Sequence, residues 1–478
     1  MHDIHVIDPV SRIEGHAKIT LHLDGEGQVE DARFHITEFR GFEEFCRGRL
    51  LAEMPGLTAR TCGICPVSHL LASAKATEQV MAVRIPPAAT RLRRMANLGQ
   101  IVQSHSLSFF HLSAPDLLLG MESDPARRNV FGLMQAEPDV VRQGIGLRRY
   151  GQEVIEAVTG QRIHGTGIVA GGVAEPLTTD ARDTLRAGLD EALAAARNTL
   201  ELSFGLLDRF AEELETFGTF PSMYLAHGRP DGLWEHYDGT LTVIDADGGV
   251  IAAGLDPADY REVLGEAASS DSYLKVPYWK AALRDDDPRT AMYRVGPLAR
   301  INIAERFGTP LADAGLAALR ERVGRIASSS FLYHHARVLE VLAGLELIGE
   351  LLDHPELTDT HVRAHAEPNL RRGVGASEAP RGTLFHDYEV DANGVVTGVN
   401  LVIATGQNEL AMNRTIRDIA ARYVTGPELT DGMLNRIEAG IRSYDPCLSC
   451  STHALGQMPM VVELVDQEGV TIDERRRT

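Results

Sequence analysis

The chain has 478 residues, a hydrophobic content of 44%, a charged content of 24% and a formal net charge of −20. These proportions are typical of a globular protein, and the length suggests several domains. The negative charge repels phosphate groups, which argues against a nucleic acid or an acidic membrane surface as partner. No apolar run reaches the roughly 20 residues that cross a bilayer. The amino terminus does not resemble a signal peptide, so we expect a cytoplasmic protein without direct membrane contact.

The first forty residues predict β-structure. Residues 5–7, 17–23 and 29–36 alternate between polar and apolar side chains or are β-branched, which is typical of strands. The turn sequence of residues 24–27, Asp-Gly-Glu-Gly, predicts a hairpin between the last two strands.

Helices are expected to follow over most of the next 180 residues. Apolar residues recur at three-or-four spacing, which predicts helices at 66–80, 87–113, 125–158 and 178–215, and again at 309–352. Thr179 or Asp180 could cap the helix at 178–215. We expect these apolar stripes to face a common core.

Smaller β-elements are predicted between and after the long helices. Residues 218–300 are richer in glycine, proline and aspartate and predict an α+β insertion with a hairpin of 240–244 and 249–252. We expect a second hairpin of residues 382–390 with 395–403, and helices at about 409–424 and 428–444. The predicted fold class is α+β and mainly helical, with a central bundle of long helices and small N-terminal and peripheral sheets.

Two Cys-x-x-Cys pairs, Cys62 with Cys65 and Cys447 with Cys450, supply four of the five cysteines. Thiolates at this spacing select soft or borderline metals. Structural zinc modules usually keep their pairs within about 20 residues, whereas these pairs lie near opposite ends of the chain. Spacing alone leaves a zinc site, an iron–sulfur cluster and a catalytic transition-metal site open. The fifth cysteine, Cys46, is interpreted as a small buried hydrophobic residue.

The residues around the cysteines indicate a family. Residues 60–69, Arg-Thr-Cys-Gly-Ile-Cys-Pro-Val-Ser-His, and 445–453, Asp-Pro-Cys-Leu-Ser-Cys-Ser-Thr-His, resemble the paired signatures of nickel–iron hydrogenase large subunits. Three further segments resemble other signatures of this family, in the same order along the chain: 11–16, 378–382 and 401–408. The resemblance therefore covers almost the whole chain. Residues 106–124 are most similar to the cytoplasmic, bidirectional, NAD-reducing type.

The resemblance implies a nickel–iron centre held by the four cysteines. Cys62 and Cys447 would be terminal nickel ligands, whereas Cys65 and Cys450 would bridge nickel to an iron that also carries cyanide and carbon monoxide. The residues themselves agree in part, because Cys62 and Cys65 precede a predicted helix whose amino terminus favours thiolate. The diatomic ligands follow from the resemblance only.

The resemblance also assigns catalytic residues. Glu14 would receive the proton from Cys450 after heterolytic cleavage of H2, and Arg381, suspended over the open metal position, is an alternative first base. Asp116 would orient Arg381. Without their motifs, a surface glutamate in a salt bridge and a surface arginine would be the ordinary interpretations of Glu14 and Arg381.

Further residues would surround the centre. His69 follows Cys65 by one helical turn and could form a hydrogen bond with a cysteine sulfur, although it could equally be a core histidine. Thr405 would donate a hydrogen bond to an iron ligand. The resemblance also implies a second metal site, expected to hold magnesium, with Glu43, the carbonyl of Leu401 and His453 as ligands.

The implied function is reversible cleavage of H2, with electrons passed to a small iron–sulfur subunit, then through flavin-containing diaphorase subunits to NAD. The four paired cysteines are committed to the metal centre, so this chain could not also bind a relay cluster. Alternatives are a hydrogenase of the same fold serving NADP, a deazaflavin or polysulfide, and a redox-inactive or zinc-clipped subunit of a respiratory complex.

Domain organisation follows from the same resemblance. We expect residues 1–453 to form one interleaved catalytic unit, and residues 454–478 to be a maturation peptide that an endopeptidase removes after His453. The ordinary alternative for that tail is a C-terminal strand with a frayed end. The catalytic unit is expected to contain four consecutive parts: 1–40, 41–217, 218–300 and 301–453.

Overall fold

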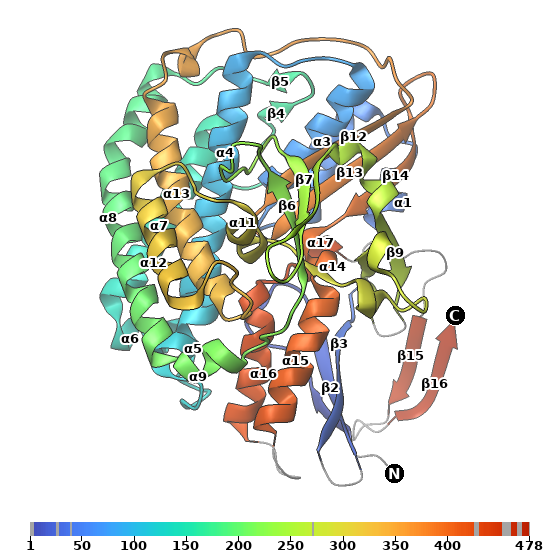
Figure 1. Cartoon of the computed structure of the whole chain (residues 1–478). Helices are drawn as coiled ribbons and strands as arrows, with labels where there is room; N and C mark the ends of the chain where they lie inside the picture. Colours follow the sequence, from blue (N-terminus) through green and yellow to red (C-terminus); the bar gives the residue numbers. More distant parts are fainter. Residues whose placement is uncertain are drawn as a thin grey trace.

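The computed structural model describes residues 4–24, 28–38, 41–269, 272–424, 430–451, 460–465 and 471–477. Long helices form a bundle along one side of the molecule, and small sheets lie beside it (Figure 1). The predicted mainly helical α+β architecture is confirmed. None of the helices in these described segments is both long and apolar enough to cross a membrane.

The N-terminal strands form an antiparallel sheet in the order β1-β2-β3, as predicted. Their bounds are β1 Ile4–Ile7, β2 Ala17–Leu23 and β3 Val29–Ile36. Alternate residues of β2 are buried, which explains the alternation in the sequence. β3 packs against the late helix α15, Glu409–Tyr423, where the Phe34 backbone N–H donates to Asn413 Oδ1 at 2.9 Å. The head of the chain therefore packs on its C-terminal third.

Most of the predicted long helices are present, and short helices lie between some of them. Their bounds are α3 Pro66–Met81, α4 Pro87–Ser106, α5 Ala114–Leu119, α6 Val130–Ala136, α7 Pro138–Thr159, α8 Thr179–Arg209, α9 Ala211–Thr216, α12 Pro310–Val323 and α13 Leu332–Leu352. A π-helical segment, Leu107–Ser113, joins α4 to α5. Figure 1 shows α4, α7, α8 and α13 side by side in the bundle.

Two details of the helix predictions are wrong, and one predicted helical region divides into two helices. The cap of α8 is Thr178, whose hydroxyl accepts the Ala181 backbone N–H, rather than Thr179 or Asp180. The long helical region predicted at 309–352 contains two helices, because Gly324 ends α12 with a φ of +83°. The helix predicted from residue 125 begins only at Val130, where the Asn129 side chain caps α6.

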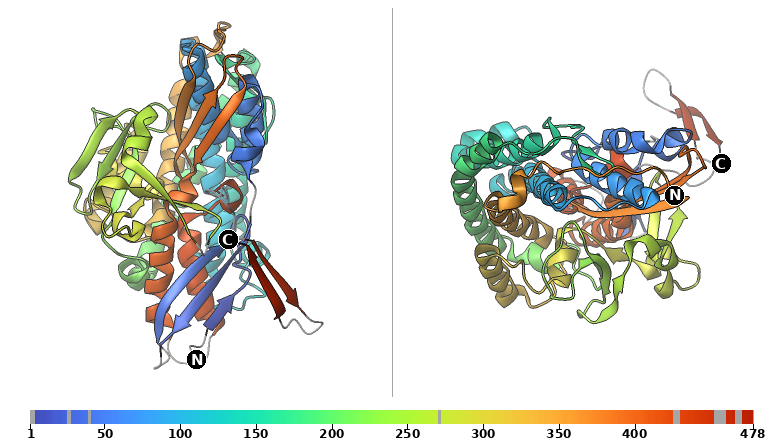
Figure 2. Two further views of the ribbon diagram at one scale, coloured as in Figure 1. Left: turned by 90° about the vertical axis from the view of Figure 1, so that its right-hand side faces the viewer. Right: turned by 90° about the horizontal axis from the view of Figure 1, so that it is seen from above.

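The insertion lies on one side of the bundle (Figure 2). Its main sheet has the order β11-β6-β7-β8 and includes the predicted hairpin, while β9 pairs with β10. The bounds here are β6 Met223–Gly228, β7 Thr240–Ile244, β8 Val250–Leu255, α10 Tyr260–Val263, β9 Leu264–Ala268, β10 Lys275–Trp279, β11 Tyr293–Arg294 and α11 Pro297–Ile303. The short hairpin β4 Ile168–Val169 with β5 Gly172–Val173 follows α7.

The second predicted hairpin belongs to a three-stranded sheet, β12-β13-β14, whose first strand was not predicted. Its strands are β12 Arg372–Ala379, β13 Gly382–Val390 and β14 Val396–Val402. α3 packs on β12 at close range, because a Cβ on Gly375 would lie 2.0 Å from the Ala72 carbonyl oxygen.

The remaining elements surround the cysteine pairs or end the chain. They are α1 Phe42–Cys46, α2 Met54–Thr58, α14 Ala404–Gln407, α16 Asp431–Tyr444, α17 Leu448–Ser451, β15 Met460–Val465 and β16 Thr471–Arg477. Two distant parts of the chain meet where Glu14 forms an isolated β-bridge with Cys447, and the Leu448 N–H donates to the Glu14 carbonyl at 3.2 Å. β15 and β16 form an antiparallel hairpin that projects from the body (Figure 2).

Candidate metal centre

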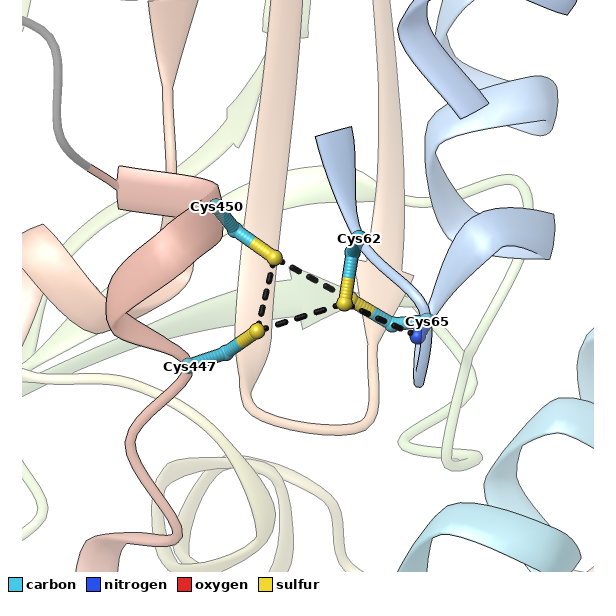
Figure 3. A group of neighbouring side chains, drawn as sticks. All are labelled: Cys62, Cys65, Cys447 and Cys450. Atoms are coloured by element: carbon cyan, nitrogen blue, oxygen red, sulfur yellow. Dashed lines mark hydrogen bonds between the residues drawn. The ribbon is translucent and has the colours of Figure 1, made fainter. Parts of the chain in front are cut away.

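The structure brings the four paired cysteines together. Cys62 Sγ lies 3.3 Å from Cys447 Sγ, Cys65 Sγ lies 3.6 Å from Cys450 Sγ, and the sulfurs of Cys447 and Cys450 are 2.7 Å apart. All four sulfurs lie within 4.8 Å of one another and are buried (Figure 3). Four soft donors at this separation can bind a common metal centre.

Helix ends position both cysteine pairs. Cys65 is the N-cap residue of α3, whose first residue is Pro66, and the N–H groups of Ile64 and Cys65 point to the Cys62 sulfur at 3.2 and 3.1 Å. Asp445 ends α16 in the left-handed conformation, with a φ of +53°, and turns the chain toward Cys447. The dipole of α3 therefore favours negative charge at the first pair.

The thiols of Cys65, Cys447 and Cys450 do not titrate alike. Hydrogen bonds from Cys447, Cys450 and Cys62 hold the pKa of Cys65 well below its ordinary value, against the effect of burial. Burial raises the pKa of Cys447 and Cys450 well above theirs. The cluster thus favours one thiolate while other sulfurs keep their protons, which a metal would displace on binding.

Arg381 lies beside the cluster and is held by Asp445. Arg381 Nε donates to the Asp445 carbonyl, Nη2 donates to Asp445 Oδ1 at 3.1 Å, and Nη1 donates to Ser104 Oγ at 3.4 Å. Burial alone would lower the pKa of Arg381, but Asp445 and the sulfur groups of Cys447 and Cys65 raise it well above its ordinary value. The guanidinium therefore remains charged and stabilises thiolate at the cluster.

Asp116 does not orient Arg381, so that prediction is wrong. Asp116 lies in α5 and forms ion pairs with Arg12 and with Arg442, whose Nη1 is 2.8 Å from Asp116 Oδ2. Burial would raise the pKa of Asp116, but Arg442 and Arg12 hold it below its usual range. A position within a motif does not fix which partner a side chain reaches, and Asp116 is taken up by two other arginines.

Glu14 lies close to the second cysteine pair. The Ser449 N–H donates to Glu14 Oε2 at 3.1 Å, and Ser449 Oγ donates to Glu38 Oε2 at 3.4 Å. Glu14 is partly buried, whereas His16, which forms a hydrogen bond with Glu38, is exposed. A row of polar groups therefore leads from the residue next to Cys450 toward the surface.

Two predicted neighbours of the cysteines lie where a hydrogen bond can form. Thr405 Oγ1 accepts the Cys447 N–H at 3.0 Å. A hydrogen bond from His69 contributes to the low pKa of Cys65, and His69 Nδ1 lies 3.1 Å from His386 Nε2. Both residues thus help to fix the cluster.

Sequence reasoning missed three residues at the site. Ser104 and Asp445 contact Arg381, and His164 Nε2 lies 2.9 Å from the Cys62 carbonyl oxygen. Asp445 stands within the second cysteine signature, two residues before Cys447, and this position was the available signal. Ser104 and His164 reach the site only through the packing of α4 and of the loop after α7, which the sequence does not display.

The expected second metal site is a cluster of oxygen donors around an ammonium group. Glu43 Oε1 accepts hydrogen bonds from Lys275 Nζ at 2.6 Å and from the Leu401 N–H at 2.7 Å, and Glu266 Oε1 lies 3.2 Å from Lys275 Nζ. Two partly buried carboxylates fit a hard cation such as magnesium, which would have to compete with Lys275 for them. His453, the third predicted ligand, lies outside the described residues.

Family comparison identifies the class of protein. The model of the nickel-dependent hydrogenase family matches residues 40–126 and 253–453, and a model described as HoxL-like matches residues 6–39. The chain belongs to the nickel-dependent hydrogenase family. The donor set of Cys62, Cys65, Cys447 and Cys450 fits the nickel–iron centre of that family.

Individual hydrogenases with similar sequences or structures were also found. The chain is 41% identical to the β subunit of the NAD-reducing hydrogenase HoxS of Cupriavidus necator, with 99% of each chain covered. It is 37% identical to a subunit of the F420-non-reducing hydrogenase vhc of Methanococcus voltae, with 96% of each covered. The solved structure of an NAD+-reducing [NiFe]-hydrogenase in the H2-reduced state superimposes with a TM-score of 0.91 at 43% identity, covering 94% of this chain and 99% of that one.

Proposed function

We propose that this chain is the catalytic subunit of a hydrogenase that cleaves H2 heterolytically and reversibly and delivers the electrons, through partner subunits, to NAD+. The convergence of four buried sulfurs from the two ends of the chain carries this proposal. Similarity to the β subunit of an NAD-reducing hydrogenase, across 99% of both chains, supports the choice of acceptor.

The protein's own groups would hold the centre and move the proton. A nickel–iron centre with cyanide and carbon monoxide on the iron would supply the Lewis acidity and the redox chemistry. Cys450 Sγ would take the proton, and Glu14 would receive it at its carboxylate, which the Ser449 N–H holds in place. Arg381, charged and buried, would stabilise negative charge beside the cysteines, and the Thr405 hydroxyl would donate toward an iron ligand.

Magnesium is proposed for the second site. Glu43 and the Leu401 carbonyl would bind it together with His453, and Glu266 lies near enough to assist. Its role there would be structural, because it would join the segment after the second cysteine pair to β14.

Electron transfer requires partner subunits. Apart from the cluster, the described cysteines include only Cys46, whose pKa burial raises to about 11, so it is a poor ligand. We therefore propose that the partners are flavin-containing diaphorase subunits and a small iron–sulfur subunit, with the cytoplasm as the location.

We also propose that residues 454–478 are removed by a maturation endopeptidase, leaving residues 1–453 as the mature unit. The match to the nickel-dependent hydrogenase family ends at residue 453. The β15–β16 hairpin, which lies beyond that point, projects from the body (Figure 2).

Assay of the purified complex tests the proposed function. H2-dependent reduction of NAD+ is expected, with infrared stretching bands of iron-bound cyanide and carbon monoxide in the same sample. Reduction of NADP+, a deazaflavin or polysulfide in place of NAD+ would move the assignment to another acceptor. A complex that oxidises no H2 with any of them would contradict the proposal.

A further inference from the structure

Arg337 is a buried cation without a hydrogen-bond partner. It lies on α13 with no exposed surface, and its Nε, Nη1 and Nη2 atoms form no hydrogen bond within the part of the chain that the structure describes. Arg300, equally buried, shows the usual arrangement, because it donates to Glu340, Glu378 and two backbone carbonyls. The guanidinium lies 5.6 Å from the centre of the Tyr333 ring, and this cation–π contact satisfies none of its N–H donors. A buried charge without hydrogen bonds is strongly destabilising, so Arg337 requires an explanation.

The carboxylate that acts most strongly on Arg337 is Asp445. Burial lowers the pKa of Arg337 to about 10, and Asp445 is the first of the groups that oppose this shift. Arg337 therefore stays charged at neutral pH. Glu340, one helical turn further on α13, is less available, because Arg300 and His105 already bind its two carboxylate oxygens.

One carboxylate oxygen of Asp445 accepts no hydrogen bond from the residues that the structure describes. Its Oδ1 accepts the hydrogen bond from Arg381 Nη2, whereas Oδ2, although 3.1 Å from that nitrogen, is buried and accepts no hydrogen bond within the described chain. Burial raises the pKa of Asp445, and Arg381 and Arg337 together oppose the rise. The carboxylate therefore lies in the field of two guanidinium groups, one of which lies beside the cysteine cluster.

We propose that Arg337 is a positioning residue for Arg381. It acts through its charge, or through an ordered water, on Asp445, the carboxylate that accepts the hydrogen bond from Arg381. Two arginines with one aspartate leave a net positive charge next to the cysteine sulfurs, which balances the negative charge of thiolates. The inference rests on the proposed function, because the position of Arg381 can affect catalysis only if the neighbouring cysteines hold a metal centre.

A double-mutant cycle in the complete, metal-loaded complex tests this role. The variants are R337M, D445N and R337M/D445N, with R337K to restore the charge. R322M serves as control, since Arg322 is a surface residue of α12 paired with Asp208. Nickel content, infrared bands of the iron ligands, and kcat and KM for H2 are measured for each.

If Arg337 acts through Asp445, R337M keeps its nickel, lowers kcat by about tenfold or more with little change in KM, and shifts the infrared bands. The double variant then loses little more than the worse single variant, and R337K recovers much of the loss. R322M stays like wild type in all readouts. Wild-type bands and kcat in R337M, or effects that multiply in the double variant, would overturn the proposal.

Two outcomes separate the inference from the function. A wild-type complex without nickel or H2 oxidation contradicts the proposed function itself, whereas an active wild type with multiplying effects contradicts only the role of Arg337. Should R337M not assemble, R337K is used in the same cycle. Its loss of kcat must be smaller in the D445N background than in the wild-type background, and equal losses would refute the role.

Discussion

Individual side chains at the cysteine cluster divide into those that bind and those that orient. Cys62, Cys65, Cys447 and Cys450 supply four sulfur donors, while Asp445 fixes Arg381 beside them. The sequence motifs were sufficient to predict that these four sulfurs meet. They were not sufficient to name the partner of Arg381. The predicted partner was Asp116, whereas the observed one is Asp445, which the end of α16 brings to Arg381.

Replacing Glu14 by glutamine tests the proton route. E14Q keeps the size of the side chain and the hydrogen bond from Ser449 but removes the exchangeable proton, so we expect at least about a hundredfold loss of H2 oxidation with nickel still bound. E44Q, at an exposed glutamate of α1, is the control and should retain wild-type activity. Substantial turnover in E14Q would show that another group carries the proton.

Buried histidines predict how stability depends on pH. Burial lowers the pKa of His105 to about 4 and of His236, His334 and His335 to about 3. The folded protein keeps these rings neutral, whereas the unfolded chain protonates them near pH 6.5. Their contribution to stability is therefore complete above pH 6.5 and is lost as the pH falls toward 4, by up to about 1.4 kcal/mol per pH unit for each histidine.

Urea unfolding at several values between pH 7.5 and pH 5 measures this loss. His335→Gln removes one titrating ring. The free energy of unfolding of this variant should therefore fall less steeply with decreasing pH than that of wild type, with a slope smaller by up to about 1.4 kcal/mol per pH unit, the value for one proton. Parallel curves for wild type and His335→Gln would contradict the buried, neutral state of His335.

Among the elements, the contact of α3 with β12 decides where the first cysteine pair lies. Gly373 and Gly375 of β12 face α3, and a Cβ at either would lie about 2 Å from a backbone oxygen of the helix: 2.2 Å for Gly373 and 2.0 Å for Gly375. This strand was missed because its glycines, alanines and buried polar residues do not alternate as an amphipathic strand does. Close packing, rather than patterning, requires those residues.

Gly375→Ala should therefore lower the free energy of unfolding by about 1–3 kcal/mol, since the added methyl group clashes with the backbone of α3. Gly146→Ala is the matched control. Nothing lies within 4 Å of a Cβ at Gly146, in the interior of α7, and the change should stabilise by up to about 1 kcal/mol. Denaturant unfolding measures both, and an unchanged midpoint for Gly375→Ala would contradict the packing.

The long helices were predictable because their apolar spacing is regular, and their interruptions were less so. The break between α12 and α13 begins at Gly324, which has a positive φ, and residues 325–331 connect the two helices. The N-terminal strands and the hairpin of β13 with β14 followed from alternation and turn residues. Which helices adjoin which was not predictable, since non-local packing leaves no periodic signal in the sequence.

At the scale of the whole molecule, both ends of the catalytic region meet at one place. The β-bridge from Glu14 to Cys447 joins the segment between β1 and β2 to the second cysteine pair, so both ends must be folded to complete the site. Family signatures predicted this convergence, although residue spacing alone could not distinguish a nickel–iron centre from zinc.

The proposed maturation step predicts a shorter chain in the active enzyme. Intact-mass spectrometry of the active complex should find a large subunit that ends at His453, lacking residues 454–478. Chains isolated from cells without nickel should keep those residues, because removal is expected to follow metal insertion. A fully active complex in which every large subunit retains residues 454–478 would contradict a maturation peptide.

Metal analysis of the purified wild-type chain in its complex tests the central claim most directly. The claim is that sulfurs from the two ends of the chain bind one nickel–iron centre. After subtraction of the iron bound by partner clusters, we expect about one nickel and one iron per chain, both lost in a Cys65→Ser, Cys450→Ser variant. Zinc in place of nickel, or nickel retained in that variant, would contradict it.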